Sequence, residues 1–452
     1  MEAALKRSRA EYTEIRLEEE VHSWIAFKGE ELDSIGTAGS VGGMVRAMVK
    51  GGWGVVTFND VEDLESKVRE AVESARMVGR EKSLLAPVEP AVEVLPTTLE
   101  EDFRAIPLSE KKATVEAYNR AMLEYHEHIQ TTNVRYGDSF RRVRLATSEG
   151  TYIEEERPDL SVRLSAIARD GEIVQRASES VGGDQEGFRI ARGLEEKALS
   201  VAKRAVDLLT APPVQGGTYT VVLDPRLAGV FAHEAFGHLS ESDFVYENER
   251  LKQLMTLDRR FGPDFLNILD DGSLPGGRGT HTYDDEGTRT RKTYLIREGI
   301  LVGRLHSRET AAKMGEPPTG NARALNYQFE PIVRMTNTYI DKGDKCFKDL
   351  LKDIKLGIYA VDALGGQTMM EMFTFSAAHA YMIRDGEVAE LVRDVVLTGN
   401  VFDTLMHIEA IGDQVVWMKT GGGCGKGGQS PLPVGIGSPP IRIAQLVVGG
   451  RQ

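Results

Sequence analysis

Alternating apolar and polar positions predict β-strands at the start of the chain. Residues 13–17 alternate apolar and charged side chains, and the apolar run at 24–27 leads into a Lys-Gly-Glu turn at 28–30. A period of two is typical of strands with one buried face, so we expect a hairpin or meander here. The period then changes to that of a helix, because one apolar stripe is formed by Leu64, Val68, Val72 and Ala75.

Helix and strand patterns continue up to residue 217. We expect amphipathic helices at 109–128 and 194–209, with three short strands between them at 143–145, 151–153 and 162–168. Proline-rich segments mark two connections, one near 86–98 and one at 212–217. The sequence therefore predicts an N-terminal α/β domain, residues 1–216, made of strands covered by amphipathic helices, with a sub-boundary near 86–98.

The second half of the chain, residues 217–452, has mostly strand-like patterns. An apolar run at 219–223 predicts a buried strand, and two hairpins with charged Glu-Gly or Asp-Gly turns are expected at 294–302 and 380–388. We expect the last strand at 441–448. Together the two halves predict an α+β protein whose C-terminal domain is mostly antiparallel β-structure.

Composition and charge argue against a nucleic-acid-binding, secreted or membrane protein. The net charge is −14, and basic residues are interspersed with acids, which argues against a nucleic-acid partner. We find neither a signal-peptide pattern nor an apolar stretch of the ~18 residues that a membrane span requires. The two cysteines, Cys346 and Cys424, are typical of a protein in a reducing compartment. We therefore expect a cytoplasmic protein with no membrane or nucleic-acid partner.

The most informative short motif is His-Glu-Ala-Phe-Gly-His at residues 233–238, on a short helix that follows the buried strand. Imidazole is a good Zn²⁺ ligand, and Glu234 could take a proton from water at such a metal. The two histidines are five residues apart, however, so a regular α-helix would separate them by ~140°. For His233 and His238 to share a metal, the helix must contain a π-bulge or break near Gly237. Otherwise the motif is an ordinary helix with two unrelated histidines.

A second candidate lies in the glycine-rich stretch 421–429, which contains Cys424 and Lys426. The stretch fails the Walker pattern for phosphate binding, because Thr420 and Gly427 stand at two required positions. We expect the lysine charge to favour a Cys424 thiolate, which is the ligand that would complete a two-histidine site. Three protein ligands and one open position would make a catalytic rather than a structural metal site.

These motifs resemble the TldD/PmbA family of zinc metallopeptidases, specifically the TldD branch. The resemblance rests on residues 233–238 and on segments spread from about 219 to 440, namely Tyr-Asp-Asp-Glu-Gly at 283–287, Pro331 with Arg-Met-Thr-Asn-Thr at 334–338, and Gly-Cys-Gly-Lys-Gly-Gly-Gln at 423–429.

The resemblance implies a function that the residues alone leave open. It implies a zinc ion held by His233, His238 and Cys424, with Glu234 as the general base. It also implies short or unfolded peptides as substrates, and a homodimer or a heterodimer with an inactive paralogue. No substrate-binding residues follow from it. We therefore predict a zinc-dependent peptidase.

Two other functions fit the same residues. The first is a cysteine hydrolase with Cys424 as nucleophile and His379 or His407 as base, although both histidines lie in apolar surroundings typical of a core. The second is a non-catalytic, chaperone-like peptide-binding protein with a structural zinc. It requires a fourth ligand, for which Glu241, His281 and His306 are candidates. Glu241 and Asp243 could instead orient the metal-binding histidines by hydrogen bonding.

Overall fold

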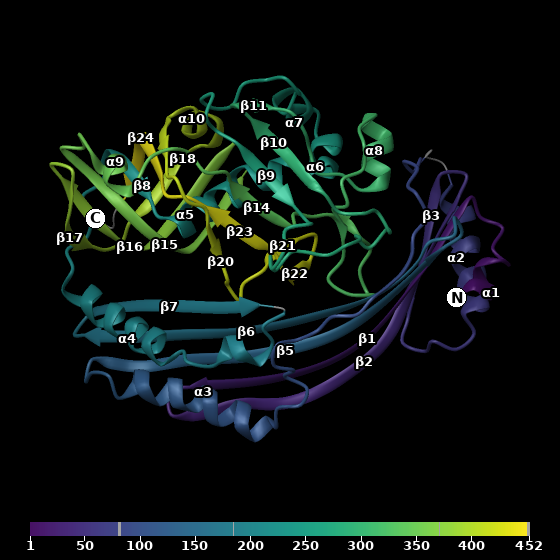
Figure 1. The fold of residues 1–452 in the computed structure, drawn as a ribbon, viewed down its shortest axis with the longest axis horizontal. Helices are drawn as coiled ribbons and strands as arrows, with labels where there is room; N and C mark the ends of the chain where they lie inside the picture. Colours follow the sequence, from purple (N-terminus) through teal and green to yellow (C-terminus); the bar gives the residue numbers. More distant parts are fainter. Residues whose placement is uncertain (80–82, 184, 370, 450–452) are drawn as a thin grey trace.

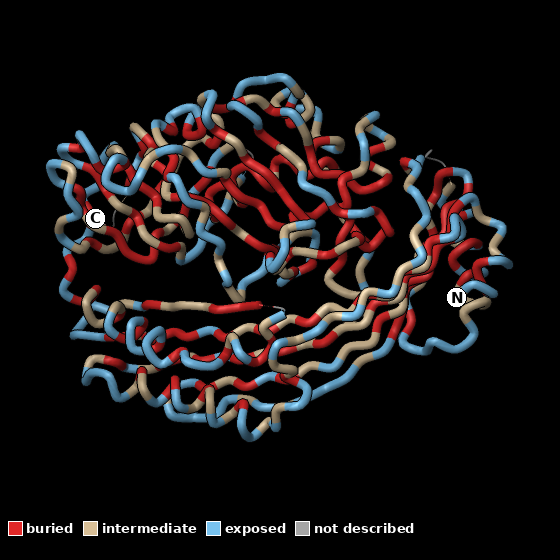
Figure 2. Tube along the Cα trace, viewed as in Figure 1, coloured by how far each residue is buried: buried red, intermediate tan, exposed pale blue. Residues whose placement is uncertain are grey.

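The computed structural model describes residues 1–79, 83–183, 185–369 and 371–449. Its N-terminal part is a long, curved sheet, and residues 217–449 form a second part, the C-terminal body, that lies over one face of that sheet (Figure 1). The buried residues are most concentrated inside the C-terminal body (Figure 2).

The N-terminal sheet has the order β3-β2-β1-β5-β6-β4, with β7 also paired to β6. Neighbouring strands are antiparallel except for β4, which is parallel to β6. The bounds are β1 Tyr12–Lys28, β2 Glu31–Val49, β3 Gly52–Phe58, β4 Val92–Leu95, β5 Ile129–Thr147, β6 Tyr152–Asp170 and β7 Ile173–Gly183.

Helices cover parts of this sheet. Helix α2 packs on β2 and β3 at one end, and α3 and α4 share a core with β5, β6 and β7 at the other (Figure 1). The bounds are α1 Glu2–Leu5, α2 Leu64–Val78, α3 Leu108–Leu123 and α4 Glu195–Thr210, with a 3₁₀ turn at Phe188–Ala191. The prediction of strands covered by amphipathic helices is confirmed. The helix expected to reach residue 128 ends five residues earlier, at Leu123.

The three segments expected as short strands between residues 143 and 168 are β-structure, but their bounds and number are wrong. The structure has instead two strands of 19 residues each, β5 and β6. In these two strands charged side chains stand at positions where a prediction looks for apolar ones. Arg142 and Arg144 on β5 pair with Glu154 and Glu156 on β6 across the ladder. Such cross-strand ion pairs stabilise a sheet, but they remove the apolar signal on which the prediction depended.

The C-terminal body contains a small barrel and a second sheet. The order β15-β8-β24-β18-β16 closes on itself because β16 also pairs with β15; β17 extends β16 and β19 pairs with β24. The bounds are β8 Gly217–Leu223, β15 Leu356–Met369, β16 Met372–Arg384, β17 Glu387–Val392, β18 Val396–Asn400, β19 Ile408–Ile411 and β24 Ile441–Gly449, with α9 Phe347–Leu351 and α10 Val401–Met406 alongside.

The second sheet has the order β11-β10-β9-β14-β23-β20. Its bounds are β9 Ile268–Asp271, β10 Lys292–Arg297, β11 Ile300–Leu301, β14 Asn337–Ile340, β20 Val416–Met418 and β23 Gly435–Ser438. Two short hairpins, β12 Ala322–Arg323 with β13 Ile332–Val333 and β21 Cys424–Lys426 with β22 Gln429–Leu432, complete the body. The α+β class is confirmed. Pairing in the body is mixed, since β8 and β15 are parallel, as are β14 and β23.

Buried and partly buried ion pairs join the sheet to the C-terminal body. Arg46 on β2 contacts Glu14 at 2.7 Å and Glu286 at 3.0 Å, and Arg157 on β6 contacts Asp285 at 2.7 Å. The acidic segment 283–287 singled out in the sequence is thus a junction between the two parts. Within the described residues, no helix is both long and apolar enough to cross a membrane.

Candidate metal centre

The helix that carries the histidines starts at an N-cap directly after the buried strand β8. The Asp224 side chain accepts a hydrogen bond of 2.8 Å from the Leu227 N–H, and Pro225 occupies the first position of α5 Pro225–Phe231. Both features favour a helix start. The helix then continues into a π-helical turn at Ala232–Gly237 and a 3₁₀ turn at His238–Ser240.

The π-helical turn brings the two histidines together. The His238 N–H donates to the carbonyl of His233, a spacing of five residues instead of four. The imidazole ring centroids lie 5.3 Å apart as a result. The distortion predicted from the five-residue gap is therefore present, and the two side chains share one side of the helix.

Gly237 has a different role from the one expected. Its backbone is ordinary right-handed helix, with φ −56° and ψ −51°, so glycine is not required for an unusual conformation or a helix break. A Cβ at this position would instead overlap the sulfur of Met335, which is fully buried. Glycine is present because the metal-site helix packs directly against that side chain.

We expect Gly237→Ala to destabilise the protein by about 1–3 kcal/mol, because the overpacked Met335 must shift in a closed core. Urea denaturation would measure this cost. In a Met335→Ala background the cost should nearly disappear, since the overlap is gone. Gly422→Ala is the matched control, because a Cβ there meets open space. An equal cost of Gly237→Ala in both backgrounds would contradict the packing explanation.

Cys424 joins the histidines from the far end of the chain. It starts β21, is buried, and its Sγ lies 3.3 Å from His238 Nε2. Candidate ligand atoms of His233, His238 and Cys424 all lie within 4.8 Å of one another, and this is the one such group of three or more found among the described residues. The fully buried Arg334 fixes the hairpin, because it donates to the carbonyls of Cys424 at 2.8 Å and Gln429 at 3.3 Å.

The thiol is strongly acidic in this environment. Burial alone would raise the pKa of Cys424, but hydrogen bonds and positive charge from His233 and His238 lower it to about 5. For His238, burial lowers the pKa, whereas the Glu241 carboxylate and Cys424 raise it to about 10. The predicted thiolate is thus supported, but the histidines rather than Lys426 produce it. The Lys426 ammonium contacts the carboxylates of Glu241 and Asp243 instead.

Lys426 lies in a buried polar cluster behind the histidine. His238 Nδ1 lies 2.9 Å from Glu241 Oε2, and Lys426 Nζ lies 3.1 Å from the same oxygen. The lysine also contacts Asp243 at 2.7 Å and donates to the Val333 carbonyl. Glu241 therefore orients His238 as expected for a carboxylate that supports a ligating imidazole. The sequence did not reveal that the lysine joins this cluster.

Glu234 lies on the open side of the cluster. Its carboxylate is about one-third exposed, and its Oε2 is 3.8 Å from His238 Nε2. A glutamate in this position is accessible to solvent and lies beside a candidate metal ligand.

The other histidines considered from the sequence lie elsewhere. His306 contacts Ser242 and Glu316, and His281 faces the carbonyl of Gly279. His379 is buried, whereas His407 is exposed, so the expectation of a core position is wrong for His407. Glu241 contacts the ring nitrogen of His238 that faces away from Cys424. None of these side chains joins the three-ligand cluster in the described structure.

Comparisons with known proteins agree with this geometry. Three family models match: PmbA/TldA metallopeptidase domain 1 at residues 13–76, its central domain at 101–211 and its C-terminal domain at 216–450. The last of these alone covers more than half of the chain. The chain belongs to the PmbA/TldD metallopeptidase family.

Individual relatives and a solved structure match most of the chain. A metalloprotease of Synechocystis is 48% identical over 98% of this chain and 96% of its own length. A zinc metalloprotease TldD homolog of Saccharolobus solfataricus is 33% identical over 72% of each chain. The crystal structure of TldE from Thermococcus kodakarensis has the same fold, with a TM-score of 0.76, 16% identity and coverage of 99% of this chain and 98% of that one.

The arrangement in this PmbA/TldD protein suits a divalent metal of intermediate softness. Two imidazole nitrogens and one thiolate are a donor set that zinc accepts, and three protein ligands leave a coordination position open. The hydrogen bond that orients His238 is a feature expected of a metal-binding imidazole.

Proposed function

We propose that the chain is a zinc-dependent peptidase that hydrolyses short or unfolded peptides, with His233, His238 and Cys424 as the metal ligands and Glu234 as the general base. The observation that carries the proposal is the convergence of these three ligand atoms within 4.8 Å, with a partly exposed carboxylate beside them. A relative of the same family that is named a zinc metalloprotease supports the choice of metal.

Each side chain has a distinct task in this proposal. Zinc, when bound, supplies Lewis acidity that lowers the pKa of water and polarises a scissile carbonyl. Glu234 accepts the proton of the attacking water and later delivers it to the leaving amine. Glu241 holds His238 through Nδ1, so that Nε2 faces the Cys424 side. Arg334 and Lys426 keep the cysteine hairpin against the histidine helix.

The proposed assembly is a dimer, either of two copies or with an inactive paralogue. This part rests on the family resemblance. Size-exclusion chromatography with light scattering on the purified chain would measure its mass directly. A monomer at working concentrations that nevertheless hydrolyses peptides would contradict an obligate dimer.

The main test combines metal analysis with digestion of an unstructured peptide. We expect close to one zinc per chain, peptide hydrolysis that a chelator abolishes, and recovery when zinc is added back. Cleavage that persists after the metal has been removed would contradict the proposal. A full zinc complement without cleavage of any peptide would favour the chaperone-like alternative.

One observation favours a cysteine nucleophile as a second candidate. The pKa of Cys424 is lowered to about 5 and two imidazoles lie beside it, which is how nucleophilic cysteines are activated. Cys424 is only 4% exposed, however, and so has little room to attack a peptide. His379 and His407, the bases that this mechanism was expected to use, are not among its contacts.

A further inference from the structure

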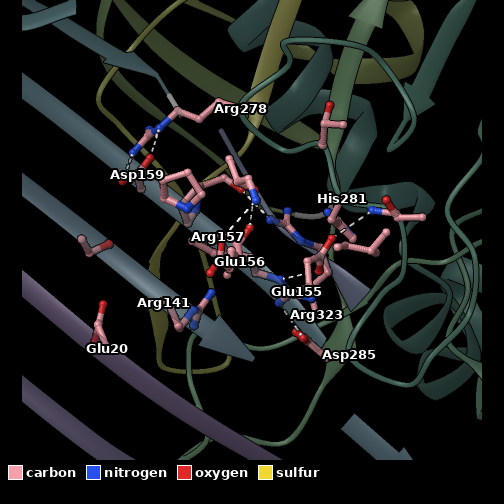
Figure 3. A pocket seen from close by; sticks show the side chains of 18 of the residues that line it. Glu20, Arg141, Glu155, Glu156, Arg157, Asp159, Arg278, His281, Asp285 and Arg323 are labelled. Carbon is pink, nitrogen blue, oxygen red and sulfur yellow. Dashed lines mark hydrogen bonds and ion pairs between the residues drawn. The ribbon is translucent and has the colours of Figure 1, made fainter. Parts of the chain in front are cut away.

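A polar cavity of about 480 Å³ lies between the N-terminal sheet and the C-terminal body. The end of β4, the middle of β5 and the first half of β6 form one wall, and the loop 278–285, Arg323 on β12 and residues 431–433 form the other (Figure 3). Its volume is in the range of ligand-binding pockets. No residue of the metal cluster lines it, so it is a separate feature of the molecule.

The cavity nevertheless borders on the metal centre. Leu432, in its wall, pairs with Cys424 across the β21–β22 hairpin. Arg323 donates to the carbonyl of Met335, the residue whose side chain packs against Gly237 on the metal-site helix. A chain that occupies the cavity would therefore lie against the hairpin that carries Cys424 and against Arg323, which contacts the residue packed on the histidine helix.

Most charges in the wall are already compensated. Arg157 contacts Glu155 at 2.8 Å and Asp285 at 2.7 Å, and both nitrogens of the Arg278 fork contact Asp159 at 2.8 Å (Figure 3). These pairs leave a polar but nearly neutral surface. Such a surface suits an uncharged polar chain better than a free ion, which would have to compete with the existing partners.

His281 presents a hydrogen-bond acceptor that has no protein partner. Its Nδ1 lies 2.9 Å from the Gly279 carbonyl, and because a carbonyl only accepts, Nδ1 carries the proton. Burial, together with the charges of Arg323 and Arg157, holds the pKa of His281 well below its usual range, so the ring is neutral. Nε2 is then a lone-pair acceptor, and it is buried without a hydrogen bond from any described residue.

Arg323 presents donors in the same wall. It is 8% exposed, and two of its five N–H groups are used by the carbonyls of Met335 at 2.6 Å and Pro433 at 2.8 Å. The guanidinium carries further N–H groups beyond these two, and they can donate to a ligand in the cavity. Burial and the nearby Arg334 lower its pKa to about 9, whereas Asp285 and Asp270 partly compensate its charge. A neutral acceptor such as a carbonyl oxygen therefore suits the further N–H groups of Arg323.

We propose that this cavity is a substrate subsite that binds an amide group, with the amide N–H donating to His281 Nε2 and its carbonyl accepting from Arg323. An amide supplies one donor and one acceptor, which complement the unpartnered Nε2 of His281 and the further N–H groups of Arg323. The amide belongs either to the peptide main chain or to an Asn or Gln side chain. The inference rests on the proposed peptidase function, since it takes the ligand to be a peptide.

Peptide binding to the Glu234→Gln protein tests the subsite without turnover. Fluorescence anisotropy with a labelled unstructured peptide would compare His281→Phe, which removes the acceptor, with His281→Gln, which restores an acceptor near the Nε2 position. We expect His281→Phe to weaken binding by about 3–10-fold, as for one lost hydrogen bond, and His281→Gln to recover most of it. His407→Phe, at an exposed histidine outside the cavity, is the matched control and should leave binding unchanged.

Modified peptides identify the amide. If it belongs to the main chain, N-methylation of one peptide bond should weaken binding to the parent protein but not to His281→Phe. If it belongs to a side chain, replacing one Asn or Gln by Leu should have that effect instead. Equal binding of all these peptides, or His281→Phe binding as tightly as the parent, would overturn the subsite.

Hydrolysis by the otherwise unaltered enzyme separates the two proposals. We expect His281→Phe to raise KM with little change in kcat, because the bond to the amide is made in the ground state as well as in the transition state. Normal hydrolysis with an unchanged KM would refute the subsite and leave the peptidase intact. Absence of hydrolysis in the unaltered enzyme would refute the peptidase, and the binding measurements would still report on the cavity.

Discussion

Replacing Glu234 with glutamine is expected to lower kcat by about 10²–10⁴-fold, the usual contribution of a general base, while the protein keeps its full metal content. Glutamine has the shape of glutamate but cannot accept a proton. Glu234 is not one of the three clustered ligands, so metal binding should not depend on its charge. Steady-state kinetics on an unstructured peptide, with zinc measured on the same sample, would check both parts.

Glu249→Gln is the control for this experiment. Glu249 is a well-exposed acid on α7 Glu249–Leu254, and its contact is a surface pair with Lys252. Its loss should leave kcat unchanged. If Glu234→Gln retained nearly normal turnover, the general-base role would be wrong. The Cys424 hydrolase would then become the better explanation, because its chemistry does not require this carboxylate.

Replacing Lys426 with methionine is expected to destabilise the metal-free protein by about 3–5 kcal/mol, the usual cost of removing one partner from a buried ionic cluster. The Lys426 side chain is 5% exposed and Glu241 is fully buried, so without the lysine Glu241 would keep only His238 as its cation and Asp243 would lose its cation. Burial would raise the pKa of Glu241, whereas Lys426 and His238 lower it, which shows how strongly the ionised carboxylate depends on them.

The same substitution should also weaken zinc binding by about 10–100-fold, as for other groups that orient metal ligands. Lys426 is two residues from Cys424 and contacts the acid that holds His238, so it links the two elements of the site. Urea denaturation would measure stability, and competition with a chelator would measure affinity.

Two further variants separate charge from packing. Lys203→Met removes an exposed lysine that pairs with Asp207, and it should change stability by less than about 0.5 kcal/mol. Adding Glu241→Gln to Lys426→Met should recover part of the lost stability, because the uncompensated charge is removed. If Lys426→Met cost no more than Lys203→Met, the cluster would not hold the hairpin in place.

The sequence predicted the main features of the site because its chemistry is local. A five-residue gap between His233 and His238 cannot place both rings on one face of a regular helix, so the spacing alone required a distorted turn. The structure has that turn. Cys424 was recognisable as a third donor because a thiolate completes a two-histidine set. Its distance from the histidines could not be known from a separation of 186 residues.

Other expectations failed where long-range partners decide the outcome. Strands β5 and β6 are much longer than expected, because ion pairs with each other replace the apolar residues that usually mark a strand. Lys426 was expected to lower the pKa of Cys424. It pairs instead with Glu241 and Asp243, residues whose position near it depends on how the hairpin packs against the helix.

By itself, the sequence determined the α+β class, the family and the residues able to bind a metal. Strand and helix periods and the types of metal-binding side chain can each be recognised within a short segment of the chain. Only the tertiary structure decided why residue 237 is glycine, which carboxylate orients His238, and that a cavity lined by the unpartnered Nε2 of His281 adjoins the site. These features depend on atoms from distant segments that pack within a few ångströms, and no local pattern encodes such contacts.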